Sequence, residues 1–153
     1  MTIFILRHGQ AEAQISTDDA RRLTDKGSFD TLKVVQRRVA DMQSVVQIWA
    51  SPLVRAQQTA KLAASFFPAL EIQTTDLLVP EASPQALLKW LGELSIADQS
   101  VLLVSHQPLV GRTLNMLCGK PEDYYPMGTS SLAAISTPLI AAGMADLLWL
   151  DHA

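Results

Sequence analysis

The chain is poor in several features, and each scarcity excludes a class of protein. Its 153 residues include one cysteine, Cys118, so no internal disulfide can form, and we interpret Cys118 as a packed core residue. Aromatic residues make up 6% and charged residues 18%, against 48% hydrophobic residues, which excludes disordered and collagen-like chains. The formal net charge of −3 gives no overall attraction for nucleic acid, so a bound anion would need a local cluster of arginines.

Long uninterrupted apolar runs are also missing. The most apolar long segment, residues 132–150, contains Pro138, Gly143 and Asp146, which favours a hairpin over a membrane span. The N-terminus has no basic region ahead of an extended apolar core, so a signal peptide is not expected. We therefore predict a cytoplasmic protein without a membrane partner. Because no linker, repeat or low-complexity tract divides the chain, we expect one domain over residues 1–153.

The apolar patterns predict alternating strands and helices. Strands are expected at 2–6, 45–50, 71–75, 101–104, 131–137 and 146–150, and helices at 24–42, 51–67, 83–94 and 108–117, with a polar connection at 11–22 and loops at 77–82 and 120–130. This order predicts an α/β fold, a three-layer α/β/α sandwich with a mostly parallel central sheet of about six strands. The last two strands are expected to pair as a hairpin.

Local signals indicate where the helices begin and which face they bury. Ser51-Pro52 and Ser83-Pro84 each place a capping serine before a proline at the first helical position. In the helix predicted at 24–42, Thr24 is the expected N-cap. Apolar residues then recur three and four apart, beginning at Phe29, which is the pattern of an amphipathic helix.

Two of the three histidines follow strands of the buried type. His8 comes after the strand at 2–6, and His106 comes after the strand at 101–104. Because ligands bind beyond the carboxyl ends of parallel strands, we expect both imidazoles at the same edge of the sheet. The alternative is that each histidine is simply a polar residue ending a strand. We interpret His152 as a residue of the C-terminal tail.

Two arginines add positive charge to these histidines. Arg7 precedes His8, and Arg55 lies in the first turn of the helix predicted at 51–67, where the helix dipole disfavours a cation unless an anion binds there. A solvated surface arginine is the alternative for Arg55. Guanidinium groups bind phosphate oxygens in bidentate fashion, and a neutral imidazole can attack phosphorus. The set indicates phosphoryl chemistry, and since the histidines lack metal-ligand spacing, neither a metal nor another cofactor is expected.

Four motifs occur in order along the chain. They are Arg7-His8-Gly9, Arg21-Arg22-Leu23-Thr24-Asp25-Lys26-Gly27, Ser51-Pro52-x-x-Arg55-Ala56-x-Gln58-Thr59 and Val104-Ser105-His106-Gln107-Pro108-Leu109-Val110-Gly111. In this order and spacing, from residue 2 to about residue 136, the chain resembles the histidine phosphatase superfamily. Within it, the chain is similar to the short phosphohistidine phosphatases of the SixA type. The resemblance implies a phosphoglycerate mutase-like fold.

The resemblance also implies roles for the matched residues. His8 would be the nucleophile that forms a phosphohistidine, and Arg7, Arg55 and His106 would bind the phosphate. Arg21 is a further candidate for phosphate binding, although it comes from a connection rather than from a strand end. The neighbouring Arg22, like Arg112 in the last predicted helix, is interpreted as a surface charge.

The motifs leave the general acid open. Glu81, just before the helix predicted at 83–94, is the candidate, and a carboxylate that only stabilises the start of that helix is the alternative. SixA-type proteins resemble this chain in lacking an obvious acid motif there. An imidazole leaving group, with a pKa of roughly 6.5, can depart neutral, whereas an alkoxide needs a proton in the transition state. The absence of a strong acid therefore favours phosphohistidine as the substrate.

Three functions remain open at this point. The first is a metal-independent phosphatase acting on a phosphohistidine-bearing protein, such as a phosphotransfer domain or a phosphocarrier. The second is a small-molecule phosphomonoesterase with Glu81 as acid, and the third is a phosphate-binding module without turnover, against which the intact His8 argues. A mutase is disfavoured because the connections are too short to enclose a sugar phosphate. Residues 123–127 are interpreted as a packed loop, a loop that contacts substrate being the alternative. The oligomeric state is open, a monomer being compatible with the sequence.

Overall fold

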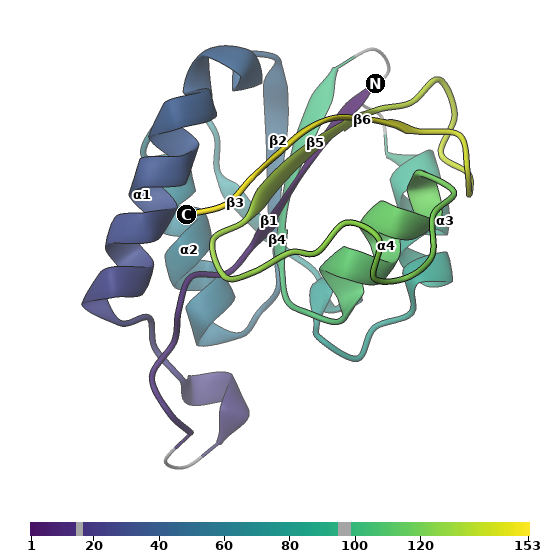
Figure 1. The fold of residues 1–153 in the computed structure, drawn as a ribbon. Coiled ribbons are helices and arrows are strands. Elements are labelled where there is room, and N and C mark those ends of the chain that lie inside the picture. Colours follow the sequence, from purple (N-terminus) through teal and green to yellow (C-terminus); the bar gives the residue numbers. More distant parts are fainter. Residues whose placement is uncertain (15–16, 95–98) are drawn as a thin grey trace.

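A computed structural model describes residues 1–14, 17–94 and 99–153, so residues 15–16 of the predicted 11–22 connection lie outside it. In chain order the helices and strands are β1 (Thr2–Arg7), α1 (Asp25–Arg38), β2 (Val45–Ala50), α2 (Val54–Ala64), β3 (Ile72–Thr74), α3 (Pro84–Glu93), β4 (Ser100–Ser105), α4 (Leu109–Leu117), β5 (Leu132–Ser136) and β6 (Asp146–Asp151). Figure 1 shows them as a sheet with helices on both sides. The predicted order of strands and helices is confirmed. None of the described helices has the length and hydropathy needed to cross a membrane.

The strands form a six-stranded sheet in the order β3-β2-β4-β1-β5-β6. β1, β2, β3 and β4 pair in parallel, whereas β5 pairs antiparallel with β1 and β6 antiparallel with β5. The predicted mostly parallel sheet and its terminal hairpin are therefore confirmed. Because β1 and β4 are adjacent and parallel, with Arg7 opposite Ser105, the residues that follow them emerge at the same edge.

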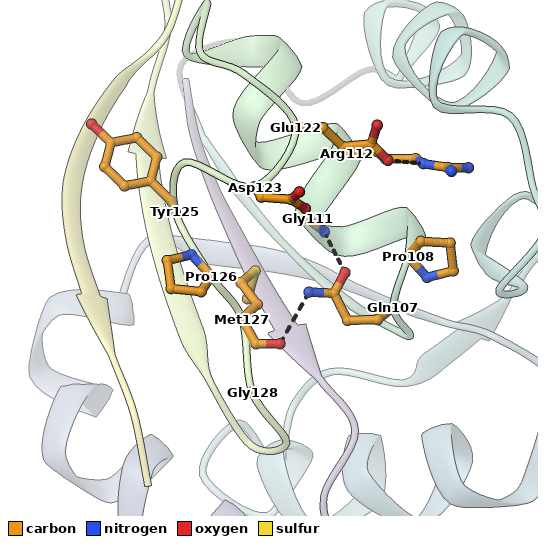
Figure 2. A pocket seen from close by; sticks show the side chains of 10 residues that line it. All are labelled: Gln107, Pro108, Gly111, Arg112, Glu122, Asp123, Tyr125, Pro126, Met127 and Gly128. Carbon is orange, nitrogen blue, oxygen red and sulfur yellow. Dashed lines mark hydrogen bonds and ion pairs between the residues drawn. The ribbon is translucent and has the colours of Figure 1, made fainter.

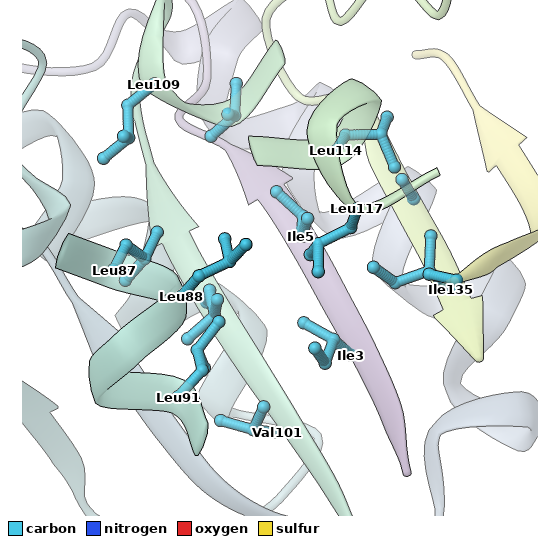
Figure 3. Close-up of a cluster of buried hydrophobic side chains, with 14 of the residues drawn as sticks. Ile3, Ile5, Leu87, Leu88, Leu91, Val101, Leu109, Leu114, Leu117 and Ile135 are labelled. Atoms are coloured by element: carbon cyan, nitrogen blue, oxygen red, sulfur yellow. The ribbon is translucent and has the colours of Figure 1, made fainter. Parts of the chain in front are cut away.

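The two faces of the sheet carry separate apolar cores. Ile3 and Ile5 of β1 point to the face covered by α3 and α4, which Figure 3 shows, and Phe4 and Leu6 pack on the face covered by α1 and α2. This alternation explains why the first strand is apolar without interruption, since both of its faces are buried. Burial of each such side chain contributes at most about 1.5–3 kcal/mol. The cores hold β1 rigid, and with it the residues at its end.

Helix α1 buries the face that its apolar spacing predicts, with Val35 fully buried and Leu32 partly buried, except at the first position. Phe29 is 66% exposed, whereas Asp30 and Thr31 are buried beside Val34 and Val35. The helix also ends at Arg38, and residues 39–42 form a 3-10 helix rather than a further turn of α1. The reason is a tertiary contact: Gly27 at the start of α1 packs so closely on the backbone after β1 that a side chain there would collide with it. That contact fixes the rotation of the helix.

The Ser51-Pro52 pair does not begin a helix as predicted. Helix α2 begins at Val54 with Leu53 as its N-cap, and it ends at Ala64, earlier than expected. Ser51 is completely buried, and its hydroxyl hydrogen-bonds the imidazole of His106 instead. The equivalent prediction for α3 is confirmed, because the Ser83 hydroxyl accepts a hydrogen bond from the backbone N–H of Ala86. The local signal is the same in both places, and a tertiary partner overrides it at Ser51.

Candidate active site

The ends of β1 and β4 bring the two predicted histidines together. The imidazole centroids of His8 and His106 are 5.0 Å apart with their planes at 57°. The backbone N–H of His8 donates to the carbonyl of Ser105, which fixes the two strand ends relative to each other. The prediction that both imidazoles lie at one edge of the sheet is confirmed. Arg7, His8, Arg55 and His106 are called the His–Arg cluster below.

The contacts of His8 define which ring nitrogen is free. Nδ1 lies 2.7 Å from the carbonyl oxygen of Gly9, which can only accept, so Nδ1 carries the proton. Nε2 then has a lone pair, and it accepts a hydrogen bond of 3.3 Å from Nε of Arg55. Burial, opposed by the Gly9 carbonyl and reinforced by nearby arginines, lowers the pKa of His8 to about 4. At neutral pH the imidazole is therefore uncharged and its Nε2 is available as a nucleophile.

Two further members of the cluster hold buried nitrogen atoms that lack hydrogen-bond partners. Nε of Arg7 and Nδ1 of His106 are buried, and within the described residues neither has a hydrogen-bond partner. Arg7 is anchored by its NH1, which donates to the carbonyl of Met127 at 3.0 Å. Burial and the charge of Arg55 lower the pKa of Arg7. Burial, followed by the neighbouring imidazole of His8 and the charge of Arg55, lowers the pKa of His106 to about 3. Unpartnered buried nitrogen atoms beside positive charges favour the binding of an anion.

The segment after β1 supplies a carboxylate that the sequence analysis missed. Asp18, in a 3-10 helix (Asp18–Ala20), accepts hydrogen bonds from Arg55 through its backbone oxygen at 2.8 Å and its Oδ2 at 3.0 Å. Its Oδ1 accepts from NH1 of Arg21 at 3.0 Å, so the Arg21 expected near the site is linked to Arg55 through Asp18. Hydrogen bonds from Arg21 and Arg55 lower the pKa of the Asp18 carboxyl. Asp18 thus occupies guanidinium donors that a phosphate would use.

Helix α2 is fixed to the end of β1 by side chains of the Ser51–Thr59 motif. The Thr59 hydroxyl donates to the carbonyl of Arg55 at 2.8 Å and accepts from the N–H of Gly9 at 3.1 Å. Oε1 of Gln58 accepts from the N–H of Leu23 at 2.8 Å, which joins the same helix to the connection that follows β1. Gly9 itself is required by space, because a Cβ there would lie 2.7 Å from the carbonyl oxygen of Gly27. These contacts explain why the motif residues place Arg55 beside His8.

Among the described residues, the side chains of the remaining predicted charges form no hydrogen bond or ion pair with this network. Glu81 is exposed in the turn before α3, and within the described part of the chain it forms no hydrogen bond or ion pair. Arg22 is exposed, and Arg112 pairs with Glu122 at the surface, so both are surface charges as predicted. Over residues 1–14, 17–94 and 99–153, no group of three or more His, Cys, Asp or Glu side chains is arranged to hold a metal ion.

A cavity of about 400 Å³ lies between the start of α4 and the loop of residues 122–128 (Figure 2). It is lined by Gln107, Pro108, Gly111, Arg112, Glu122, Asp123, Tyr125, Pro126, Met127 and Gly128. The carbonyl of Met127 accepts hydrogen bonds from both Arg7 and the side-chain amide of Gln107, so one wall of the cavity is tied to the cluster. The loop interpreted as ordinary packing therefore borders a cavity, and its Met127 carbonyl contacts Arg7.

Comparison with known proteins gives the class to which this site belongs. The sequence pattern described as "Histidine phosphatase superfamily (branch 1)" matches residues 3–79. A phosphohistidine phosphatase SixA homolog of Haemophilus influenzae is 34% identical over 144 residues, covering 86% of this chain and 87% of that protein. The phosphohistidine phosphatase SixA of Escherichia coli K12 is 30% identical over 156 residues, covering 97% of this chain and 92% of that protein. The chain belongs to the histidine phosphatase superfamily.

A solved structure places the chain more narrowly within the superfamily. The protein histidine phosphatase SixA complexed with tungstate superposes with a TM-score of 0.84 at 26% identity, covering 99% of this chain and 97% of that one. Together with the sequence relatives, this similarity shows a SixA-like phosphatase, a hydrolase, and confirms the phosphoglycerate mutase-like α/β fold.

Proposed function

We propose that this phosphatase hydrolyses phosphohistidine on another protein through a covalent phosphohistidine at His8. The observation that carries the proposal is the state of His8: its Nδ1 is bound to a carbonyl and its Nε2 carries a lone pair beside Arg55. Around it stand buried nitrogen atoms of Arg7 and His106 that have no hydrogen-bond partner among the described residues. This arrangement supports attack on a phosphoryl group whose oxygens the arginines and His106 bind.

The reaction follows in two displacements at phosphorus. In the first, Nε2 of His8 forms a bond to phosphorus while the bond from phosphorus to the substrate imidazole breaks, and that imidazole leaves neutral because its other nitrogen is protonated. In the second, water attacks the phosphorus on His8, the P–N bond breaks and inorganic phosphate departs. In both steps Arg7 and Arg55 compensate the charge on the equatorial oxygens.

The acid–base groups of the site support phosphohistidine over a phosphate ester. An alkoxide leaving group needs a proton donor, and Glu81, the candidate named from the sequence, is exposed and forms no hydrogen bond with the cluster among the described residues. Asp18 is the carboxyl that contacts Arg55, and its lowered pKa keeps it ionised at neutral pH, so it is a poor proton donor. A leaving imidazole needs neither. The relatives carry the name phosphohistidine phosphatase, which agrees with this choice.

We further propose the setting in which the reaction occurs. The partner would be a phosphotransfer domain or phosphocarrier that carries phosphohistidine. Residues 1–153 would act as one domain in the cytoplasm, as inferred from composition and from the absence of a linker in the sequence.

The test compares three substrates in the presence of a metal chelator. We expect fast release of phosphate from a histidine-phosphorylated phosphocarrier, slower turnover of p-nitrophenyl phosphate, and the slowest turnover of a phosphoserine peptide. The variant His8→Asn should be inactive on all three. Equal rates on all three substrates would contradict the preference for phosphohistidine, and full turnover by His8→Asn would contradict the mechanism.

A further inference from the structure

Ser51 lies at the end of β2, one strand away from the strand that carries His106. β2 and β4 pair in parallel with Ala50 opposite Val104, and the N–H of Ser51 continues the ladder by donating to the carbonyl of Val104 at 3.0 Å. The Ser51 side chain is completely buried, and its Oγ lies 2.7 Å from Nε2 of His106. The backbone at both ends of this contact is thus held by the sheet.

The hydrogen-bond partners of Ser51 determine the direction of this contact. A serine hydroxyl has one hydrogen to donate and two lone pairs. One lone pair accepts from the backbone N–H of Leu53 at 3.3 Å, and within the described residues Nε2 of His106 is the one acceptor in reach of the hydroxyl hydrogen. Either direction leaves one buried hydrogen without an acceptor among the described residues: the Ser51 hydroxyl hydrogen if His106 donates, or the Nδ1 hydrogen of His106 if Ser51 donates. A phosphate oxygen bound in the cluster can accept the Nδ1 hydrogen, whereas no other described group in reach can accept the hydroxyl hydrogen. Ser51 therefore donates to Nε2.

If Nε2 accepts this hydrogen bond, the single proton of the neutral imidazole is on Nδ1. Nδ1 of His106 is buried and has no hydrogen-bond partner among the described residues, and the ring stands beside that of His8. The two histidines then present opposite functions to one ligand: His8 a lone pair for phosphorus, and His106 an N–H for a phosphoryl oxygen. We propose, on the basis of the phosphoryl transfer proposed above, that Ser51 is a positioning residue that holds His106 as the Nδ1–H tautomer and so makes it a phosphate donor.

Loss of the Ser51 hydroxyl should allow the proton of His106 to occupy either ring nitrogen, without removing a contact to the substrate. In Ser51→Ala, Nε2 has no donor, so the proton can move to it and Nδ1 then presents a lone pair to the phosphate. Because the N–H bond is worth most when charge develops on the phosphoryl oxygens, we expect kcat to fall roughly 10- to 100-fold with KM changed less than about threefold. The kcat of Ser51→Cys, whose thiol is a weak donor of similar size, should lie between those of the wild type and Ser51→Ala.

A matched control exists at the end of β4. Ser105 is also a buried serine at a strand end, and its hydroxyl donates to the carbonyl of Leu78 at 2.6 Å rather than to the cluster. With p-nitrophenyl phosphate as substrate, Ser105→Ala should keep a kcat near wild type while losing a comparable buried hydrogen bond. An equal fall of kcat in Ser105→Ala and Ser51→Ala would show a merely structural role for Ser51 and overturn the proposal.

The tautomer itself can be observed without turnover, by nitrogen NMR of the histidine side chains at neutral pH. The signals of His106 are assigned by their loss in His106→Asn. We expect a protonated Nδ1 and an unprotonated Nε2 in the wild type, a shift of the Nδ1 signal on addition of inorganic phosphate, and loss of both features in Ser51→Ala. A proton on Nε2 in the wild type, or an unchanged tautomer in Ser51→Ala, would overturn the proposal. These spectra need no phosphohistidine substrate, so a failure of the proposed function leaves this test intact.

Discussion

Two arginine–aspartate pairs differ in which elements they connect and in how completely each carboxylate is held. Arg38 of α1 donates from Nε and NH2 to both carboxylate oxygens of Asp151 in β6, at 2.7 and 2.9 Å, and its guanidinium lies 4.3 Å from the ring centre of Trp149. Arg55 of α2 donates NH2 to one oxygen of Asp18 at 3.0 Å and NH1 to its backbone oxygen. The first pair joins a helix to a sheet, whereas the second joins a helix to the connection after β1.

The two pairs differ in which partner is buried: the carboxylate in one pair and the guanidinium in the other. At Arg38 the carboxylate is the shielded partner, since the side chain of Asp151 is 14% exposed and that of Arg38 is 28% exposed. At Arg55 the cation is shielded, with 4% exposure, and the side chain of Asp18 is 44% exposed. A buried guanidinium whose counter-ion reaches it from the solvent side can exchange that carboxylate for another anion. The same pair of residue types therefore joins the helix to the sheet in one place, and in the other leaves a buried guanidinium that fits the anion site we propose.

The largest expected effect comes from exchanging arginine for lysine at the site. Arg55→Lys keeps the charge and loses the planar fork that contacts His8 and Asp18 and that we propose to bind the phosphate, so turnover of p-nitrophenyl phosphate should fall roughly 100-fold. Circular dichroism and thermal denaturation check that the variant is folded. Turnover within threefold of wild type would show that Arg55 is only a partner of Asp18.

The same exchange at the other pair should affect stability and leave catalysis unchanged. Arg38→Lys loses one of two parallel hydrogen bonds to Asp151 and the stacking on Trp149, so the free energy of unfolding should fall by about 1–2 kcal/mol. Urea denaturation measures this change, and kcat should stay near wild type. A loss of turnover without a loss of stability would reverse the roles assigned to the two pairs.

The two regions should also respond to acid in different pH ranges. The folded-state pKa values of His8 and His106 lie at about 4 and about 3, below the ordinary 6.5, so the unfolded chain binds protons first. The free energy of unfolding should therefore fall as the pH drops from 6.5 toward 4. The carboxyl pKa of Asp151 is lowered from 3.8 by Arg38, so the contribution of that pair is lost only below this range.

Urea denaturation at several pH values between 7 and 4 checks this difference. His8→Asn should show a shallower fall of stability than wild type, because one buried imidazole no longer needs to stay neutral. Asp151→Asn should show the wild-type dependence in this range at lower overall stability. Equal pH dependence in His8→Asn and wild type would contradict the burial of a neutral His8.

The smallest expected effect concerns the carboxylate that occupies Arg55. Asp18→Asn removes the charge that competes with phosphate, so inorganic phosphate should inhibit turnover of p-nitrophenyl phosphate with roughly two- to fivefold tighter binding. Asp19→Asn is the matched control, since it removes the same charge from the neighbouring exposed residue. Equal effects of both substitutions would indicate a general charge effect rather than competition for Arg55.

The sequence predicts what depends on local pattern and chain order. Alternating apolar segments predict the strands, the helices and the terminal hairpin, and the parallel arrangement of β1 and β4 then places His8 beside His106. Phe29 and Ser51 escape this reasoning because their environment is tertiary. The contact of Gly27 with the backbone rotates α1 so that Phe29 faces solvent, and the imidazole of His106 takes the hydroxyl that the Ser51-Pro52 pattern assigns to a helix cap.

The only feature of the sequence that points to Asp18 is its negative charge close to arginines. It lies in the connection that also supplies Arg21, and an acid near arginines expected to bind an anion is a signal for a competing counter-ion. The contact of Met127 with Arg7 has no such signal, because a backbone carbonyl is available at every residue and 120 positions separate the two. The catalytic roles and the single-domain organisation stay predictions.

The central claim, that His8 attacks phosphorus, is tested most directly by trapping the enzyme during turnover. A histidine-phosphorylated phosphocarrier carrying labelled phosphate is mixed with the protein, and the reaction is stopped within milliseconds in alkaline detergent, where phosphohistidine survives. We predict label on the peptide that contains His8, lost on acid treatment and absent from His8→Asn. Release of phosphate at the full rate with no label on the protein, or from His8→Asn, would contradict the account.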